Sequence, residues 1–97
     1  MPKGYIVAEL YITNPGPGFE EYRAKVGATV EAFGGRFLTR GGDPALLEGD
    51  HPAGRMVILE FDSPERAMEW YKSAAYQDIL PLRLNNAATR VVCAAGT

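Results

Sequence analysis

The chain has 97 residues, of which 46% are hydrophobic and 23% are charged. This length suits one domain with a single core, and the composition is that of a globular protein. The formal net charge of -2 excludes the basic surface that binding to nucleic acid or to anionic membranes requires. We therefore expect a single domain over residues 1–97 with no nucleic-acid or membrane partner.

Cysteine content and the absence of targeting signals indicate the compartment. Cys93 is the only cysteine, so no internal disulfide and no zinc-binding cysteine cluster can form. Its neighbours Val91 and Val92 favour a small buried side chain in a strand. The first residues lack the pattern of a signal peptide, and no apolar run reaches the ~20 residues of a membrane span. We expect a cytoplasmic protein.

The first half of the chain predicts a strand, a helix and a second strand. Residues 5–12 alternate between two faces, which is typical of a strand. The break at "TNPGPG" follows, where Thr13 or Asn14 could cap a helix. The next apolar residues are spaced three or four apart, as on one helix face: Phe19, Tyr22, Val26, Val30 and Phe33. Two glycines then end the helix before a short strand over residues 36–40.

The second half predicts a strand, a helix and a strand. Residues 55–61 form the third strand, after a loop rich in glycine and proline. Ser63 is the expected N-cap of the second helix and Pro64 its first residue. We expect Pro81 to end or kink this helix. The last strand is expected over residues 89–95.

The order β-α-β-β-α-β predicts an α+β, ferredoxin-like fold. In this arrangement a four-stranded antiparallel sheet has the first and third strands at its centre, and both helices cover one face. The other face would carry large side chains: Tyr5, Val7, Tyr11, Met56 and Ile58. Pairing with the same face of a second copy would cover them, and two-fold symmetry is the commonest arrangement. We therefore expect a homodimer.

Several motifs resemble a known family. They are "FGGRFLTRGG" (residues 33–42), "LEG" (47–49) and "LEFDSPERAMEWYKSAAYQDILPLR" (59–83). Together they resemble the uncharacterised domain of unknown function 1330, in the dimeric α+β barrel superfamily. The resemblance implies a dimeric barrel but no reaction, because that superfamily includes cofactor-independent monooxygenases, isomerases, haem enzymes and ligand-binding regulators. The family's usual Tyr-Gly-Gly begins here with Phe33, so a hydroxyl is missing.

The stretch from Trp70 to Arg83 holds candidate site residues. Trp70 and Tyr71 lie on the apolar stripe of the second helix, which favours packing in the core. Tyr76 and Arg83 flank the predicted break at Pro81, where binding groups are common. The Arg83 guanidinium could bind a carboxylate or phosphate with two parallel hydrogen bonds. Its alternative role is an ion pair, with Asp78 or Glu60 as candidate partners.

A second group of polar residues lies in the loop after the second strand. Arg40 precedes two glycines, which allow close approach of an anion. Glu48 could serve as a general base if it were buried, and otherwise as an ion-pair partner of Arg36 or Arg40. His51 is the only histidine, and no metal-binding spacing surrounds it, so we expect it to be exposed and expect no metal.

Two glutamates in the predicted strands leave alternatives open. Glu9 and Glu60 could share a proton as a carboxylate pair, or each could meet an arginine such as Arg36 or Arg90. Which face they occupy depends on strand register.

The leading hypothesis is a small-molecule site between helices and sheet in each subunit. Its walls would be Tyr22, Arg40, Trp70, Tyr76 and Arg83. Aromatic walls with cations suit a planar, anionic or enolisable ligand. Any catalysis would use no cofactor, as in monooxygenation or isomerisation. The alternatives are a non-catalytic dimer that binds a metabolite or protein, and a purely structural dimer.

An RNA-recognition module is excluded, because Met56 and Ile58 stand where stacking rings are needed.

Overall fold

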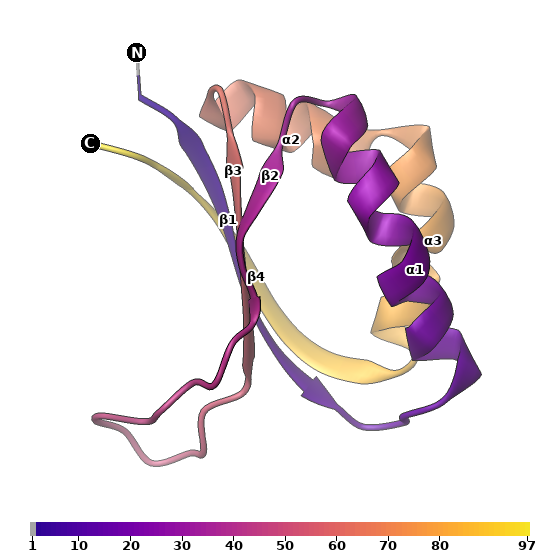
Figure 1. Ribbon diagram of the computed structural model, residues 1–97, viewed down its shortest axis with the longest axis vertical. Helices are drawn as coiled ribbons and strands as arrows, with labels where there is room; N and C mark the ends of the chain where they lie inside the picture. Colours follow the sequence, from indigo (N-terminus) through magenta and orange to yellow (C-terminus); the bar gives the residue numbers. More distant parts are fainter. Residues whose placement is uncertain (1) are drawn as a thin grey trace.

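The computed structural model describes residues 2–97 and has the predicted β-α-β-β-α-β order, with the second helical segment divided in two. Its elements are β1 (Gly4–Ile12), α1 (Pro17–Ala32), β2 (Arg36–Gly41), β3 (Arg55–Phe61), α2 (Pro64–Lys72), α3 (Ala74–Leu84) and β4 (Ala87–Ala95). Figure 1 shows all three helices on one side of the sheet. None of the helices in the described chain is long and apolar enough to cross a membrane.

The sheet has the predicted ferredoxin-like topology. Its order is β2-β3-β1-β4, so the first and third strands are central, and the three strand pairs are all antiparallel. In this register Ile6 lies opposite Leu59 on one side and Cys93 on the other. A bulge in β2 between Phe37 and Thr39 lets Leu38 remain exposed.

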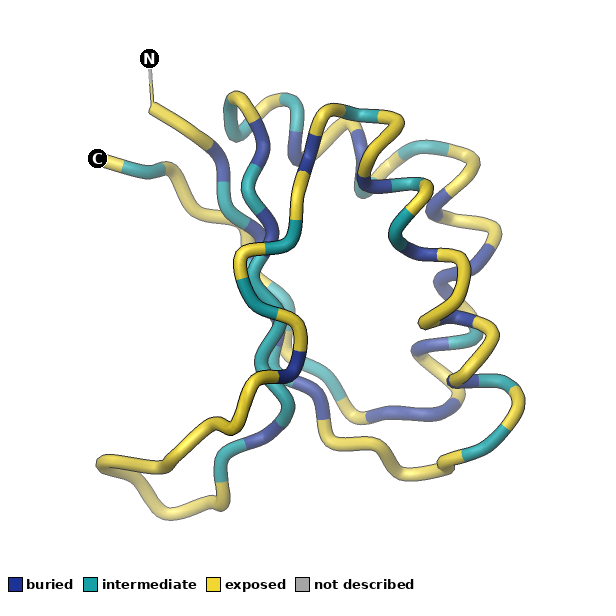
Figure 2. The backbone as a smooth tube through the Cα atoms, viewed as in Figure 1, coloured by how far each residue is buried: buried dark blue, intermediate teal, exposed yellow. Residues whose placement is uncertain are grey.

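Alternation along β1 divides the sheet into two faces. Ile6, Ala8 and Leu10 are buried beneath the helices on what we call the inner face. The residues between them, Tyr5, Val7 and Glu9, lie on the outer face and are only partly covered. Figure 2 shows the same change of burial along the central strands. The core therefore lies between the inner face and the helices.

The ends of α1 depend on glycines. Gly16, with φ 143°, is the N-cap, and Pro17 is the first helical residue. The predicted caps do not act there: the Asn14 amide instead donates to Asn86 Oδ1 at 2.8 Å and ties the loop to the end of α3. After the helix, Gly34 adopts φ 74°, and Gly35 lies against the ring of Phe61, where a Cβ would be 2.5 Å from the nearest ring carbon. The double glycine thus closes the helix onto the core.

The break between α2 and α3 is at Ser73 and not at Pro81. Ser63 caps α2 as predicted, since its Oγ accepts from the Arg66 N–H at 3.0 Å. Ser73 Oγ donates to the Trp70 carbonyl at 2.7 Å and accepts from the Tyr76 N–H at 3.2 Å, so one hydroxyl closes α2 and opens α3. The helix continues past Pro81 to Leu84. Of the two outcomes predicted for Pro81, an end or a kink, the end does not occur, because losing one backbone hydrogen bond does not outweigh burial of the helix's apolar face.

Two further predictions concern single residues. Cys93 faces the inner side, opposite Ile6, but it is exposed, so the prediction of a buried cysteine is wrong. The reason is its place on the edge strand β4. The loop over residues 42–54 extends away from the helices (Figure 1), and His51 is exposed there as predicted.

Candidate functional site

A cavity of about 60 Å³ lies between the inner face of the sheet and the helices. It is smaller than the ~300–1,000 Å³ typical of pockets for drug-sized ligands, so only a compact group fits inside. All five residues proposed as walls from the sequence line it: Tyr22, Arg40, Trp70, Tyr76 and Arg83. The remaining wall is largely apolar and comes from the inner face of the sheet and from α1.

One face of α3 supplies two of these residues. Tyr76, Ile79, Leu80 and Arg83 are spaced three, one and three apart and are all buried. Because residues seven apart lie two helical turns from each other on one face, Arg83 enters the core beside Tyr76. The sequence pattern predicts that both residues flank a broken segment. They are instead held by one continuous helix, which orients them rigidly.

A chain of hydrogen bonds crosses the closed part of the cavity. The hydroxyls of Tyr22 and Tyr76 are 2.8 Å apart. Arg83 Nε donates to Tyr76 Oη at 3.3 Å, and Arg83 Nη1 donates to Thr89 Oγ1 at 2.5 Å. These contacts join α1, α3 and β4. They use two of the five guanidinium N–H groups, and Arg83 Nη2 has no hydrogen-bond partner among residues 2–97.

Trp70 packs as predicted from the apolar stripe of α2. It is 2% exposed and its ring centroid lies 4.2 Å from that of Tyr76. Its indole N–H donates to Thr29 Oγ1 at 3.0 Å, which satisfies the one polar atom of the ring. Trp70 therefore belongs to the core and to the cavity wall at the same time.

Three arginines surround the open side of the cavity: Arg23, Arg40 and Arg55. Arg40 donates to the Arg23 carbonyl at 2.6 Å and its guanidinium lies 4.4 Å from the centroid of the Phe37 ring. Arg23 reaches Glu20 only at 3.4 Å, in an exposed pair. Within the described chain neither Arg40 nor Arg55 has a carboxylate within 4.0 Å.

The cavity has an unbalanced positive charge. Arg83 is 4% exposed, and no carboxylate from the described residues pairs with it, so the predicted ion pair with Asp78 or Glu60 is not formed. Burial alone lowers the pKa of Arg83, but Tyr76 and Tyr22 outweigh that effect and hold the pKa above its ordinary value. The guanidinium is therefore charged at every physiological pH. Burial also raises the pKa of Tyr22 far above its usual range, which keeps this phenol neutral.

The acidic candidates lie elsewhere. Glu48 is exposed in the loop and does not line the cavity, so the burial that a general base would need is absent. Glu9 and Glu60 lie on the outer face, opposite Met56 and Tyr5 in the register. They do not form a carboxylate pair, because Glu9 Oε2 accepts from the Gly54 N–H at 3.1 Å while Glu60 turns to Arg36 and Tyr5.

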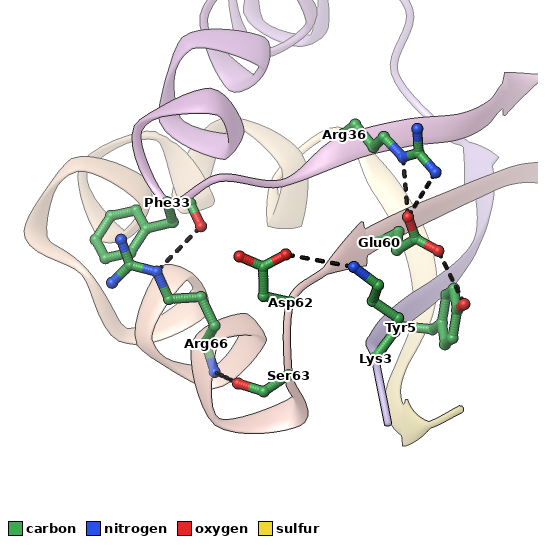
Figure 3. A network of polar contacts seen from close by, with 8 residues as sticks. All are labelled: Lys3, Tyr5, Phe33, Arg36, Glu60, Asp62, Ser63 and Arg66. Carbon is green, nitrogen blue, oxygen red and sulfur yellow. Dashed lines mark hydrogen bonds and ion pairs between the residues drawn. The ribbon is translucent and has the colours of Figure 1, made fainter. Parts of the chain in front are cut away.

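Figure 3 shows how Glu60 is held at one end of the sheet. Arg36 Nη2 lies 2.7 Å from Glu60 Oε1, and the Tyr5 hydroxyl donates to Oε2 at 2.9 Å. Of the partners considered from the sequence, Arg36 is the one found. The hydrogen bonds from Tyr5 and Arg36 lower the pKa of Glu60 below its usual value.

Three polar residues of this site were not among the candidates chosen from the sequence: Arg23, Arg55 and Thr89. Arg55 starts a period-two series with Val57, Leu59 and Phe61, so strand alternation alone could have placed it on the inner face. Thr89 has no comparable signal, because its role depends on the meeting of β4 and α3.

Comparison with known proteins places the chain in a family. It belongs to the family described as a domain of unknown function (DUF1330), whose model matches residues 3–97. No curated protein matches the sequence.

Solved structures share the fold. The RPA0582 protein of unknown function from Rhodopseudomonas palustris is 16% identical with a TM-score of 0.76, covering 99% of this chain and 83% of that chain. SnoaB, a cofactor-independent oxygenase from Streptomyces nogalater, is 11% identical with a TM-score of 0.71, covering 100% of this chain and 95% of that chain. The α+β fold predicted from the sequence is thereby confirmed.

Proposed function

We propose that the cavity of each subunit binds a small organic anion. The observation that carries this proposal is the charge of the walls: Arg83 is buried without a carboxylate, and Arg40 and Arg55 stand unpaired at the open side among the described residues. Removing an ion from water costs several kcal/mol unless a counter-charge compensates it. A ligand anion would supply the missing charge, while the apolar walls would hold its carbon skeleton.

The walls also favour binding over proton transfer. No carboxylate or imidazole lines the cavity in the described structure, and the raised pKa of Tyr22 makes its phenolate rare near neutral pH. The ligand must therefore lose its proton through its own acidity. The catalytic form of the proposal is oxygenation or isomerisation of the bound anion without a cofactor, a reaction class suggested by the fold shared with SnoaB. A binding domain without catalysis is the alternative.

We further propose that two copies pair through the outer face. Val7 lies between Ile58 and Val92 across three adjacent strands, and Val92 is 44% exposed. Glu9 and Arg90 are opposite each other at the edge of this row, but no ion pair joins them in the described structure. A two-fold axis brings each residue of a face near its complement in the other copy. Glu9 of each subunit could then pair with Arg90 of the other.

Calorimetric titration with butyrate and with butyramide tests the anion site. The two probes have similar size, but only butyrate is charged, so we expect binding of butyrate alone. The variant Arg83→Met keeps the length and apolar stem of the side chain and removes its charge. It should weaken butyrate binding by roughly tenfold or more, since hydrogen bonds to charged groups contribute about 1.5–3 kcal/mol. Leu84→Met on the exposed side of α3 is the matched control. Equal binding of both probes would contradict the proposal.

A further inference from the structure

The hydrogen-bond chain in the cavity has a direction. A guanidinium only donates, so the oxygen of Tyr76 must accept from Arg83 Nε. The 2.8 Å contact between the Tyr76 and Tyr22 hydroxyls then has two possible arrangements. Either Tyr76 donates its proton to Tyr22, or Tyr22 donates its proton to Tyr76.

The surroundings decide between these arrangements. If Tyr22 donated, the oxygen of Tyr76 would accept twice, and its own proton would have no acceptor in the described chain at a side chain that is 2% exposed. A buried donor without an acceptor is unfavourable, because it has given up its hydrogen bonds to water and gained none. If Tyr76 donates, the hydrogen bonds from Arg83 to Tyr76 and from Tyr76 to Tyr22 point in the same direction. The Arg83 charge then polarises the Tyr76 hydroxyl and makes it a stronger donor. The proton of Tyr22 is then free, and Tyr22 is the more exposed of the two phenols that line the cavity, at 9% against 2%.

We infer that Tyr22 is the terminal donor of a relay from Arg83 through Tyr76, and that the site recognises its ligand as a phenolate-type or enolate-type oxyanion. This inference rests on the proposed anion site and adds the form of the ligand to it. Tyr22 Oη contacts the ligand oxygen, Arg83 supplies the charge, and Tyr76 is a positioning residue between them. The aromatic ring of Trp70 gives the cavity a flat wall beside this oxygen, which suits a delocalised anion.

The relay predicts a measurable change in the pKa of the bound ligand. A neutral phenol and its phenolate have nearly the same size, so a site that only fits the shape binds both equally. A site that donates hydrogen bonds to the oxygen binds the phenolate more tightly and lowers the pKa of the bound ligand. No group of the protein needs to change its protonation state.

Titration of 4-nitrophenol with the intact protein measures this change, because the phenolate absorbs visible light and the phenol does not. The wild-type protein should lower the apparent pKa of the bound probe by roughly one to two units, the size expected for charge-assisted hydrogen bonds. Tyr22→Phe should weaken phenolate binding about tenfold and leave binding of the neutral phenol unchanged. Tyr76→Phe should give the same split, since it interrupts the relay without touching the ligand.

Tyr71→Phe is the matched control. Its ring packs on Tyr76, but its hydroxyl makes no hydrogen bond within the described chain and it does not line the cavity. This variant should keep the full pKa change. Circular dichroism of each variant confirms that the fold is intact.

The outcomes separate the relay from the anion site itself. If Tyr22→Phe kept the whole pKa change while Arg83→Met removed it, the relay would be overturned and the proposed anion site retained. Equal weakening of phenol and phenolate by Tyr22→Phe would also overturn the relay, because it would show a role in packing alone. If the wild-type protein bound neither form, the inference would fail, and the butyrate titration would decide the anion site independently.

Discussion

The two sides of the sheet differ in whether a buried charge has a counter-charge. On the outer face, Glu60 is a half-buried carboxylate with two partners, Arg36 and Tyr5, that neutralise and orient it. On the side of the inner face, Arg83 of α3 is more deeply buried and has only two neutral hydroxyl acceptors. The first arrangement is complete within one chain and needs nothing further. The second lacks a counter-charge, and this difference distinguishes a structural ion pair from a binding group.

The largest difference between the two faces is expected in how substitutions of packed side chains change the free energy of unfolding. Phe61 on the inner face is 1% exposed and contacts Trp70. Phe61→Ala should lower the free energy of unfolding by about 3–5 kcal/mol, because it leaves a large cavity in the core. Urea denaturation measures this loss, which should not depend on protein concentration. Ile58→Ala on the outer face is the comparison. Its effect should shrink as the concentration falls, because dissociated copies no longer bury the outer face against each other. A concentration-dependent loss for Phe61→Ala as well would break the distinction.

A charge introduced on the outer face should weaken the association of two copies and leave the fold of each copy unchanged. Val92→Asp places two carboxylates near the proposed two-fold axis, where like charges repel. We expect the dimer to dissociate at micromolar concentration while the circular dichroism spectrum is unchanged. Sedimentation velocity measures the mass. Leu84→Asp, on an exposed position of α3, is the control and should remain dimeric. A monomeric wild-type protein would contradict the proposed pairing directly.

The smallest effect is expected at Glu60. Its pKa is lowered in the folded state, so the ionised form stabilises the fold above the pKa of the unfolded chain, near 4.3. This contribution should disappear as the pH falls through the lower pKa of the folded state. Glu60→Gln should therefore flatten the acid side of the curve of unfolding free energy against pH. Asp62→Asn is the control, since Asp62 is 84% exposed and pairs with Lys3 only at 3.5 Å. An unchanged acid limb in Glu60→Gln would show that the pair contributes nothing.

The fold was largely predictable because alternation and caps are local signals. The period-two pattern of β1 and the Ser63-Pro64 start of α2 could be identified without knowing what packs against them. Pro81 and Cys93 were misjudged for a common reason. Whether a proline interrupts a helix, or a strand residue is covered, depends on neighbouring elements that one segment does not specify.

The candidate site was predictable as a set of residues and less so as an arrangement. Arginines and aromatic rings near the second helix pointed to a site, and the five chosen residues do line one cavity. Their hydrogen bonds could not be predicted, because the link from Tyr22 to Tyr76 spans 54 residues of sequence. The partner chosen for Arg83 was wrong for the same reason: only strand register shows that Glu60 faces away from the cavity.

The stability of Arg83→Met decides whether Arg83 is a binding group or a structural ion. If Arg83 is a binding group held without a counter-charge, replacing it removes a buried charge and leaves no buried partner stranded, since Tyr76 keeps its contact with Tyr22. Urea denaturation of the unliganded protein should then give a free energy of unfolding equal to or above that of the wild type. A loss of about 3–5 kcal/mol, as expected when a structural ion loses its partner, would show that Arg83 holds the fold together and would contradict the account.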